Sequence, residues 1–255
     1  MNYQNEYQSN YQGGYQGGYQ GGNQGGYQGG QSMDYTVDMV FCIDATGSME
    51  DFSGSQDKII NLVKKNAITF YSDLNKSMSG KNKSIRQLRV RIVAFRDYIA
   101  DGENAMLVTD FFMLPQQAAE FEACINSIYA KGGGDIPEDG LEALAYAIKS
   151  KWTTETAKKR HVIVVWTDAA THDLGYGRAS KYYPNGMPQD LSTLNDWWDE
   201  MNENAKRLIL FAPDEAHWNY ISRNWDNVVH YPSAAGNGLA EKNYGEILNA
   251  IANSV

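Results

Sequence analysis

The sequence predicts an α/β fold built on a mostly parallel, six-stranded sheet with one antiparallel edge strand and helices on both faces. From Tyr35 onward, apolar runs alternate with stretches of helical periodicity, a pattern typical of parallel strands joined by helices. Two of the apolar runs end at an aspartate, Asp44 and Asp168. In a parallel sheet, polar side chains at strand ends collect at the carboxyl edge, where such folds bind their ligands.

Residues 1–33 differ in composition from the rest of the chain. The tetrapeptide Tyr-Gln-Gly-Gly recurs from Tyr11, and the segment offers little apolar surface for a core. Because such a segment cannot offset the entropy lost on ordering, we expect a disordered tail with a tendency to self-associate through its tyrosine and amide groups. The folded domain is expected to span residues 34–255.

The elements in the first half of the domain follow from the spacing of apolar residues. Residues 37–43 form a nearly continuous apolar run, as expected of a central strand that is covered on both faces. A long amphipathic helix is expected after it, because apolar residues recur at helical spacing from Ile59 to Leu74. Residues 88–95 and 106–112 are expected to be strands, the second of them an antiparallel edge strand.

The second half of the domain repeats the alternation of helix and strand. Helical spacing predicts helices over residues 118–129 and 138–148. Residues 161–167 are the run richest in β-branched side chains and give the strongest strand signal. The remaining elements are two strands, each followed by a helical stretch, with the last helix near the C-terminus: residues 206–212, residues 227–231 and residues 244–251.

The charge and composition of the chain limit the kinds of partner and the cellular compartment that we expect. A formal net charge of −9 repels phosphate backbones and anionic lipids, so neither nucleic acid nor membrane is an expected partner. Cys42 and Cys124 lie within apolar and helical patterns and are expected to be reduced. No apolar run reaches the length of a membrane span, and residues 1–32 lack an apolar signal-peptide region. We expect a cytoplasmic protein, with a non-classical export route as the alternative.

A metal site is predicted where the first strand ends, in the segment Asp44-Ala-Thr-Gly-Ser48. Asp44, Thr46 and Ser48 alternate along an extended loop, so their three oxygen atoms can face one point. Asp168 ends the fourth strand and is expected in the same crevice. Oxygen ligands with few carboxylates suit a hard cation that keeps some water, namely Mg²⁺, with Mn²⁺ or Ca²⁺ as alternatives.

The segment Asp44-Ala-Thr-Gly-Ser-Met49 resembles the metal-ion-dependent adhesion site of von Willebrand factor A (VWA) domains. In that family a DxSxS or DxTxS loop follows the first strand, another loop supplies a Thr or Asp, and a fourth-strand aspartate completes the set. Here Gly132-Gly-Gly-Asp135-Ile-Pro-Glu138 resembles the middle element without its usual threonine, and Asp135 is the nearest candidate ligand. The resemblance covers residues 35–255 in element order and implies the family's doubly wound sheet.

The candidate ligands also have purely structural interpretations. Asp44 and Asp168 can cap turns through backbone amides, and Asp135 can serve equally well as the N-cap of the following helix. Arg96 and Asp97 are interpreted as a structural pair outside the site. The four histidines have no metal-ligand spacing, which argues against a zinc site, although His172 can make outer-shell contacts.

Residues 169–204 are long for a connection and carry aromatic side chains beside the predicted metal site. Tyr176, Tyr182 and Tyr183 are candidates for partner recognition, because aromatic residues on a loop at the edge of a site often contact partners. Helical spacing predicts that the remaining large apolar residues of this segment form the buried side of an ordinary helix: Leu191, Leu194, Trp198 and Met201.

The family resemblance implies a non-catalytic protein-binding module in which the bound cation accepts an acidic side chain of a partner protein. The sequence also lacks a GxSxG nucleophile elbow and a GxxxxGK[ST] phosphate loop. Two alternatives remain open. The first is a Mg²⁺-dependent phosphatase of the haloacid dehalogenase type, whose motif needs a carboxylate where Thr46 stands. The second is a scaffold that assembles through the tail.

Overall fold

The computed structural model describes residues 33–50, 59–79, 83–134, 136–232 and 249. The predicted tail and the helix expected at residues 244–251 lie outside these residues, apart from residue 249. The described chain has the predicted α/β fold: a largely parallel, seven-stranded sheet in the order β3-β2-β1-β5-β6-β7, with β4 also paired to β2. No helix in the described ranges is long and apolar enough to cross a membrane.

The central strands of the sheet run parallel, with β1 in the middle of them. β1 pairs in parallel with β2 on one side and with β5 on the other, and β6 and β7 continue the sheet beyond β5. The bounds of these strands are β1 (Met33–Asp44), β2 (Lys83–Phe95), β5 (Lys159–Trp166), β6 (Lys206–Ala212) and β7 (Val228–Pro232).

The antiparallel edge consists of two short strands where the sequence predicts one. β3 (Met106–Val108) pairs with the end of β2, and β4 (Phe112–Leu114) pairs with its middle. The strand is interrupted at Thr109, whose hydroxyl accepts a hydrogen bond from the amide of Ile92 at 3.0 Å. The Ile92 amide therefore bonds to a side chain where a regular edge strand would offer a backbone carbonyl. Because the edge strand is divided at this point, the described sheet has seven strands instead of the predicted six.

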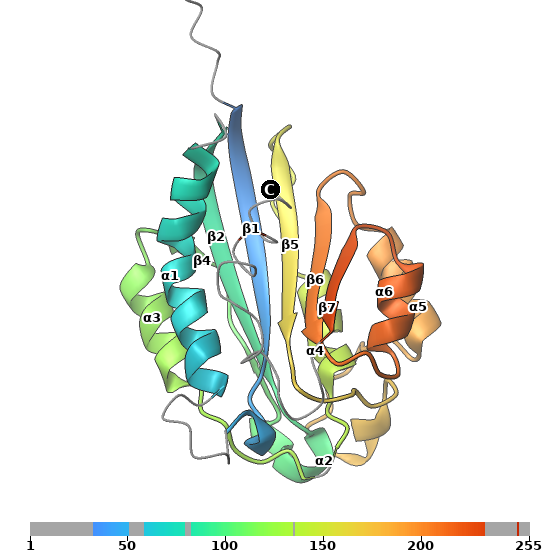
Figure 1. Ribbon diagram of the computed structural model, residues 1–255. Helices are drawn as coiled ribbons and strands as arrows, with labels where there is room; N and C mark the ends of the chain where they lie inside the picture. The colour runs from blue at the N-terminus through green and yellow to red at the C-terminus, as the bar shows by residue number, and fades with distance from the viewer. Residues whose placement is uncertain (1–32, 51–58, 80–82, 135, 233–248, 250–255) are drawn as a thin grey trace, which may run out of the picture. The chain divides into compact units, whose positions relative to one another are not determined.

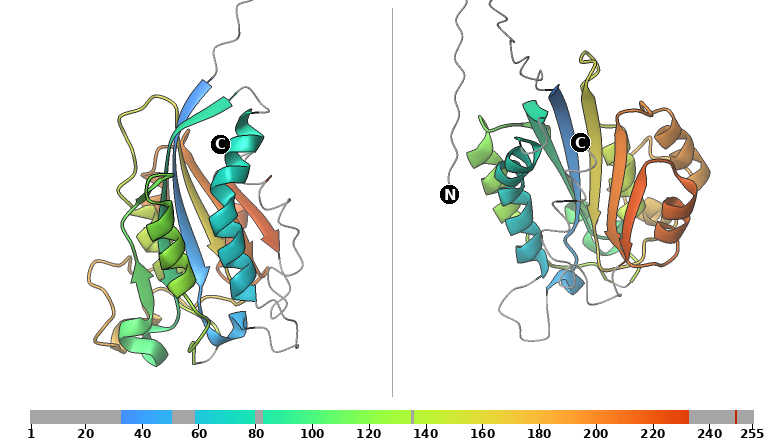
Figure 2. Two further views of the ribbon diagram at one scale, coloured as in Figure 1. Left: turned by 90° about the vertical axis from the view of Figure 1, so that its left-hand side faces the viewer. Right: turned by 45° about the horizontal axis from the view of Figure 1, so that its top comes forward.

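Helices cover both faces of the sheet (Figures 1 and 2). α1 (Ile59–Ser79) and α3 (Ala118–Ser127) pack on one face, and α4 (Gly140–Ile148), α5 (Leu191–Asp199) and α6 (Trp218–Asn224) pack on the other. Alternate residues of β1 serve the two faces: Met39 and Phe41 belong to the first core, whereas Val40 and Cys42 belong to the second. Cys42 and Cys124 are free, as predicted.

The predicted stripe of α5 is also present, although it is not uniformly buried. Leu194 and Trp198 are fully buried, whereas Leu191 and Met201 are half-buried against the same core. The side chain at the start of this stripe therefore contributes less to the core than its helical spacing suggests.

Asp38 lies in β1, away from the carboxyl end of the strand, and is fully buried in an ion pair. Its two carboxylate oxygens each accept a bond from the Arg89 guanidinium at 2.7 Å. The backbone amide of Thr153 donates to the same carboxylate at 2.6 Å. Asp38 is therefore a fully satisfied structural carboxylate.

The register of the strands brings three loops to the carboxyl edge of the sheet. Asp44 pairs with Phe95 of β2, and Ile43 pairs with Trp166 of β5, so β1, β2 and β5 end at the same level. The short helix α2 (Tyr98–Asp101) follows β2 and lies at this edge, the lower end of the sheet in Figure 1. Side chains that follow these strands are thereby placed close to one another.

Candidate metal centre

The structure brings Asp44, Thr46, Ser48 and Asp168 into one hydrogen-bonded chain. The Thr46 hydroxyl donates to Asp44 Oδ1 at 2.6 Å and lies 3.0 Å from the Ser48 hydroxyl. The Ser48 hydroxyl in turn donates to Asp168 Oδ1 at 2.9 Å. Hydroxyl oxygens of alternate residues therefore link the aspartates of two strand ends, which is the clustering that the loop sequence predicts.

This centre holds two buried carboxylates and no basic partner. Asp44 is 0% exposed and Asp168 is 3% exposed, and neither forms an ion pair with a described side chain. Burial, with the charge of Asp168 as the second cause, raises the pKa of Asp44 to about 6, against hydrogen bonds from Thr167 and Thr46 that lower it. Asp168 Oδ2 has no hydrogen-bond partner. A cation would neutralise this charge and occupy the free oxygen.

The loop that carries Thr46 and Ser48 is clamped by the segment before α4. Lys131 donates its amide to the carbonyl of Ala45, and Gly47 donates to the carbonyl of Gly132, both at 3.0 Å. The Arg96 Nε reaches the carbonyls of Ala45 and Lys131 at 2.9 and 2.8 Å. Arg96 is thus structural, as predicted, but its guanidinium binds carbonyl groups instead of Asp97.

Glu138 is a buried acid beside this centre that the sequence analysis did not assign to it. A β-carbon added at Gly133 would lie 2.6 Å from Glu138 Oε1 and 2.9 Å from the β-carbon of Thr46. The Glu138 carboxyl and the loop that carries Thr46 therefore both adjoin Gly133. Glu138 is 3% exposed and its Oε2 has no partner. Burial, followed by repulsion from Asp44 and further carboxylates, raises the pKa of Glu138 to about 10.

Asp135, the fifth predicted ligand, lies outside the described residues. The alternative interpretation of Asp135 as a helix N-cap is wrong. The predicted helix at residues 138–148 begins at Gly140, and Asp139 occupies the N-cap position. The backbone amide of Glu138 donates to the carbonyl of Ala170 in the loop after β5. The chain at Glu138 is therefore not yet helical, and the helix begins two residues later than predicted.

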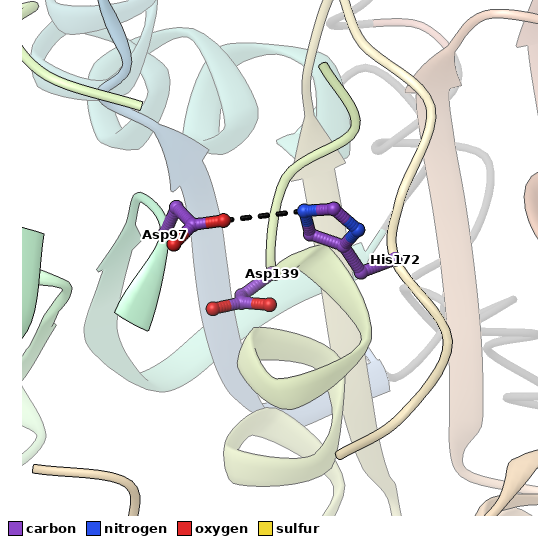
Figure 3. Close-up of side chains that lie close together, drawn as sticks. All are labelled: Asp97, Asp139 and His172. Atoms are coloured by element: carbon purple, nitrogen blue, oxygen red, sulfur yellow. Dashed lines mark hydrogen bonds and ion pairs between the residues drawn. The ribbon is translucent and has the colours of Figure 1, made fainter. Parts of the chain in front are cut away.

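A second group of ligand-type side chains lies close to the first: Asp97, Asp139 and His172 (Figure 3). One potential ligand atom from each lies within 4.8 Å of the others, and all three residues are buried. The His172 ring nitrogen Nε2 is 3.2 Å from Asp97 Oδ2. His172 is only 7% exposed, so its ring is buried together with the two carboxylates.

The three tyrosines proposed for recognition differ in their surroundings. Tyr176 and Tyr182 are 48% and 42% exposed, whereas Tyr183 is half-buried and its hydroxyl donates to Glu142 at 2.9 Å. The Tyr176 ring stacks on His172 at 3.7 Å between centroids. Two of the three are therefore exposed, Tyr176 against His172 and Tyr182 beside Gly102, and Tyr183 is mainly structural.

A sequence signal for the missed acids was present before α4. Pro137 is followed by Glu138, Asp139 and Glu142, and Glu138 and Glu142 are spaced to share one side of a helix. All three are at most 3% exposed, because α4 is buried on nearly all sides between the sheet and its neighbours.

The fold and this edge define a class of protein: an α/β module with an oxygen-rich, acidic centre at the carboxyl ends of its strands. The family model described as von Willebrand factor A domain matches residues 38–178, more than half of the chain. The chain belongs to this family. VWA domains are in general non-enzymatic adhesion or interaction modules, so membership supports an interaction role.

Comparisons with individual proteins agree with this fold. The chain is 23% identical over 155 residues to the alpha-protein kinase vwkA of Dictyostelium discoideum, which covers 61% of this chain but 22% of that protein. The PilB minor pilin of Streptococcus sanguinis superposes with a TM-score of 0.53 at 13% identity, over 85% of this chain and 61% of that one. The pilus adhesin SpaC of Lactobacillus rhamnosus GG gives 0.50 at 13% identity, over 86% and 30%. At these identities the structural likeness shows the fold alone.

Proposed function

We propose that this chain is a non-catalytic protein-binding module in which a metal-ion-dependent adhesion site holds Mg²⁺ and the ion accepts a carboxylate from a partner protein. Asp44, Thr46, Ser48 and Asp168 would hold the ion, with Asp135 as a further ligand. The observation that carries the proposal is the continuous chain of carboxylate and hydroxyl oxygens across two strand ends.

The donor set fits a hard cation. Its ligand atoms are carboxylate and hydroxyl oxygens, which Mg²⁺ prefers over nitrogen or sulfur. Two buried carboxylates without a basic partner need a positive charge, and the free Asp168 Oδ2 is an available ligand atom. Because only a few of the ligands are charged, the ion keeps some positive charge, which an acidic side chain of a partner can neutralise.

Specificity for one partner would come from the surface around the ion. Tyr176 and Tyr182 offer rigid aromatic area of the kind enriched at protein interfaces. The tail at residues 1–33 would add only avidity, through self-association. Affinity should therefore depend on the metal ligands, and the choice of partner on the tyrosines.

Calorimetric titration of the full-length, chelator-stripped chain with Mg²⁺ tests the metal. We expect binding to a single site, its loss in Asp44→Ala, and affinity at least about tenfold weaker in Ser48→Ala. Ser222→Ala is the matched control, because Ser222 is also half-buried and bonds only to a local carbonyl, that of Asn219. Undiminished Mg²⁺ binding by Asp44→Ala would refute the assignment.

Partner binding is tested by affinity capture from a native extract in Mg²⁺ and in chelator. We expect a protein retained only in Mg²⁺ by wild-type and Ser222→Ala chains, lost with Ser48→Ala, and still retained after deletion of residues 1–32. Replacing the contacting acid of the captured protein by its amide should abolish retention. Retention in chelator, or complete loss on truncation, would favour assembly through the tail.

A further inference from the structure

We propose that Asp97, Asp139 and His172 form a second cation site, separate from the Mg²⁺ centre, that takes a borderline transition-metal ion such as Zn²⁺. The three side chains come from different parts of the fold: the N-cap of α2, the N-cap of α4 and the loop after β5. The expectation from sequence that a zinc site is absent rested on the spacing of histidines, and these ligands are brought together only by the tertiary structure.

The separations of the ligand atoms suit a small ion. Two ligands at about 2.0–2.1 Å from a tetrahedral Zn²⁺ lie about 3.3 Å apart. The His172 Nε2 and Asp97 Oδ2 atoms are 3.2 Å apart, and one potential ligand atom from each of the three residues lies within 4.8 Å of the others. Small side-chain adjustments would bring all three into ligating range, and water would take the remaining position.

The two carboxylates are already oriented by the backbone. The amides of Ile99 and Ala100 donate to Asp97 Oδ1 at 2.5 and 2.8 Å, which leaves Oδ2 directed at His172. The Tyr98 amide donates to Asp139 Oδ2 at 2.6 Å. Hydrogen bonds of this kind fix ligand orientation in metal sites and are part of their construction.

Asp139 supplies a second observation that points to a ligand. Its side chain is 0% exposed, and its Oδ1 has no hydrogen-bond partner. Figure 3 shows this carboxylate beside the Asp97–His172 contact. An unpartnered carboxylate oxygen in a fully buried position is costly unless a cation or a proton occupies it.

The charge around the group favours a cation. Four buried acids, Asp97, Glu138, Asp139 and Glu142, lie close enough to raise one another's or a neighbour's pKa. Within the described ranges, His172 is the only side chain that forms an ion pair with any of them. A divalent ion would therefore add positive charge beside a cluster of acids whose one basic contact among the described side chains is this imidazole.

The imidazole distinguishes this site from the Mg²⁺ centre. Nitrogen ligands suit Zn²⁺ better than Mg²⁺, and Zn²⁺ binds mixed nitrogen and oxygen sites more tightly than Mn²⁺ does. A bound ion would also hold the His172 ring, on which the exposed Tyr176 stacks, and so would order part of the proposed recognition surface.

The test is a Zn²⁺ titration of the tag-free, full-length chain in excess Mg²⁺, with bound zinc measured by mass spectrometry after dialysis. We expect one tightly bound Zn²⁺ per chain in the wild type and in Asp44→Ala. Asp139→Asn and His172→Gln should bind Zn²⁺ at least about 100-fold more weakly. His230→Gln is the matched control, since His230 is half-buried and bonds only to the carbonyl of Ala212.

X-ray absorption at the zinc edge of the wild-type protein gives a result that does not depend on how the variants fold. A spectrum with one imidazole among oxygen ligands supports the site. The proposal is overturned if the wild type binds no Zn²⁺, if the bound ion has only oxygen ligands, or if Asp44→Ala removes it. It is equally overturned if both second-site variants retain Zn²⁺ at full affinity. Loss of Mg²⁺ binding alone would leave this site intact.

Discussion

Asp38 and Asp44 lie on the same strand and are both fully buried, but their surroundings differ in charge. Asp38 makes a two-bond contact with Arg89, whereas Asp44 accepts bonds only from neutral hydroxyl and amide groups and faces Asp168. The first carboxylate stabilises the fold directly. The second lies beside another carboxylate and has no basic partner among the described side chains.

Substitution of each aspartate by asparagine separates these roles. In chelator, Asp38→Asn should lower the free energy of unfolding by roughly 3–5 kcal/mol, because it leaves the Arg89 charge without its buried partner. Asp44→Asn should have little effect or stabilise the chain, because it removes the repulsion from Asp168. Urea denaturation measures both. An equal loss for the two variants would show that Asp44 is an ordinary structural acid.

The raised pKa values also predict how the stability of the metal-free chain depends on pH. The pKa of Glu138 in the fold is about 10, far above that of an unfolded glutamate, so the folded chain binds the proton more tightly. The contribution of Glu138 to stability therefore falls as pH rises from about 4.5 towards 10. Glu138→Gln should flatten this slope in chelator. Glu200→Gln, at an exposed acid that pairs with Lys149, should leave it unchanged.

At the scale of elements, the segment before α4 is the part of the site most sensitive to backbone change. Gly133 has a φ of +96°, and a β-carbon there would meet Glu138 and Thr46. Gly186 has a comparable φ of +82°, but a β-carbon there would meet nothing within 4 Å. Substitution at Gly186 therefore tests backbone strain alone, whereas substitution at Gly133 adds a steric conflict at the site.

Gly186→Ala should cost about 1–2 kcal/mol of stability, from the left-handed backbone alone, and should leave Mg²⁺ binding unchanged. Gly133→Ala should cost more and should also weaken Mg²⁺ binding, because the added β-carbon would displace Thr46, a proposed ligand, as well as Glu138. Thermal unfolding and calorimetry of both variants measure the two effects. Wild-type Mg²⁺ affinity in Gly133→Ala would place this segment outside the metal centre.

The elements and the site differ in how much of them the sequence could predict. The strands and helices were predictable because a parallel sheet covered on both faces imposes long apolar runs such as residues 37–43. The loop of Asp44, Thr46 and Ser48 was visible because its oxygens are adjacent in the chain. The group of Asp97, Asp139 and His172 was not, because these residues are far apart in the chain and only the tertiary structure brings them together.

The start of α4 shows a second reason why part of the site was missed. When helical spacing is interpreted from sequence, an acidic residue is assigned to the solvent-facing side of the helix. Glu142, however, is fully buried. Its Oε1 accepts bonds from the Gly175 amide and the Tyr183 hydroxyl, both supplied by a distant loop. Partners far apart in sequence cannot be inferred from local spacing.

For the whole molecule, the place of β1 between β2 and β5 implies a hierarchy of deuterium uptake. The strand is paired on both sides over most of its length, so the amides of residues 37–43 should exchange only when the entire domain unfolds. Chelation should speed exchange in residues 45–49 and 131–134 without changing the protection of β1. Mass spectrometry of exchange with and without Mg²⁺ measures this, and faster exchange throughout β1 would contradict it. The ion would then be released from a loop that opens locally, while the strand that carries Asp44 keeps the position to which the ion returns.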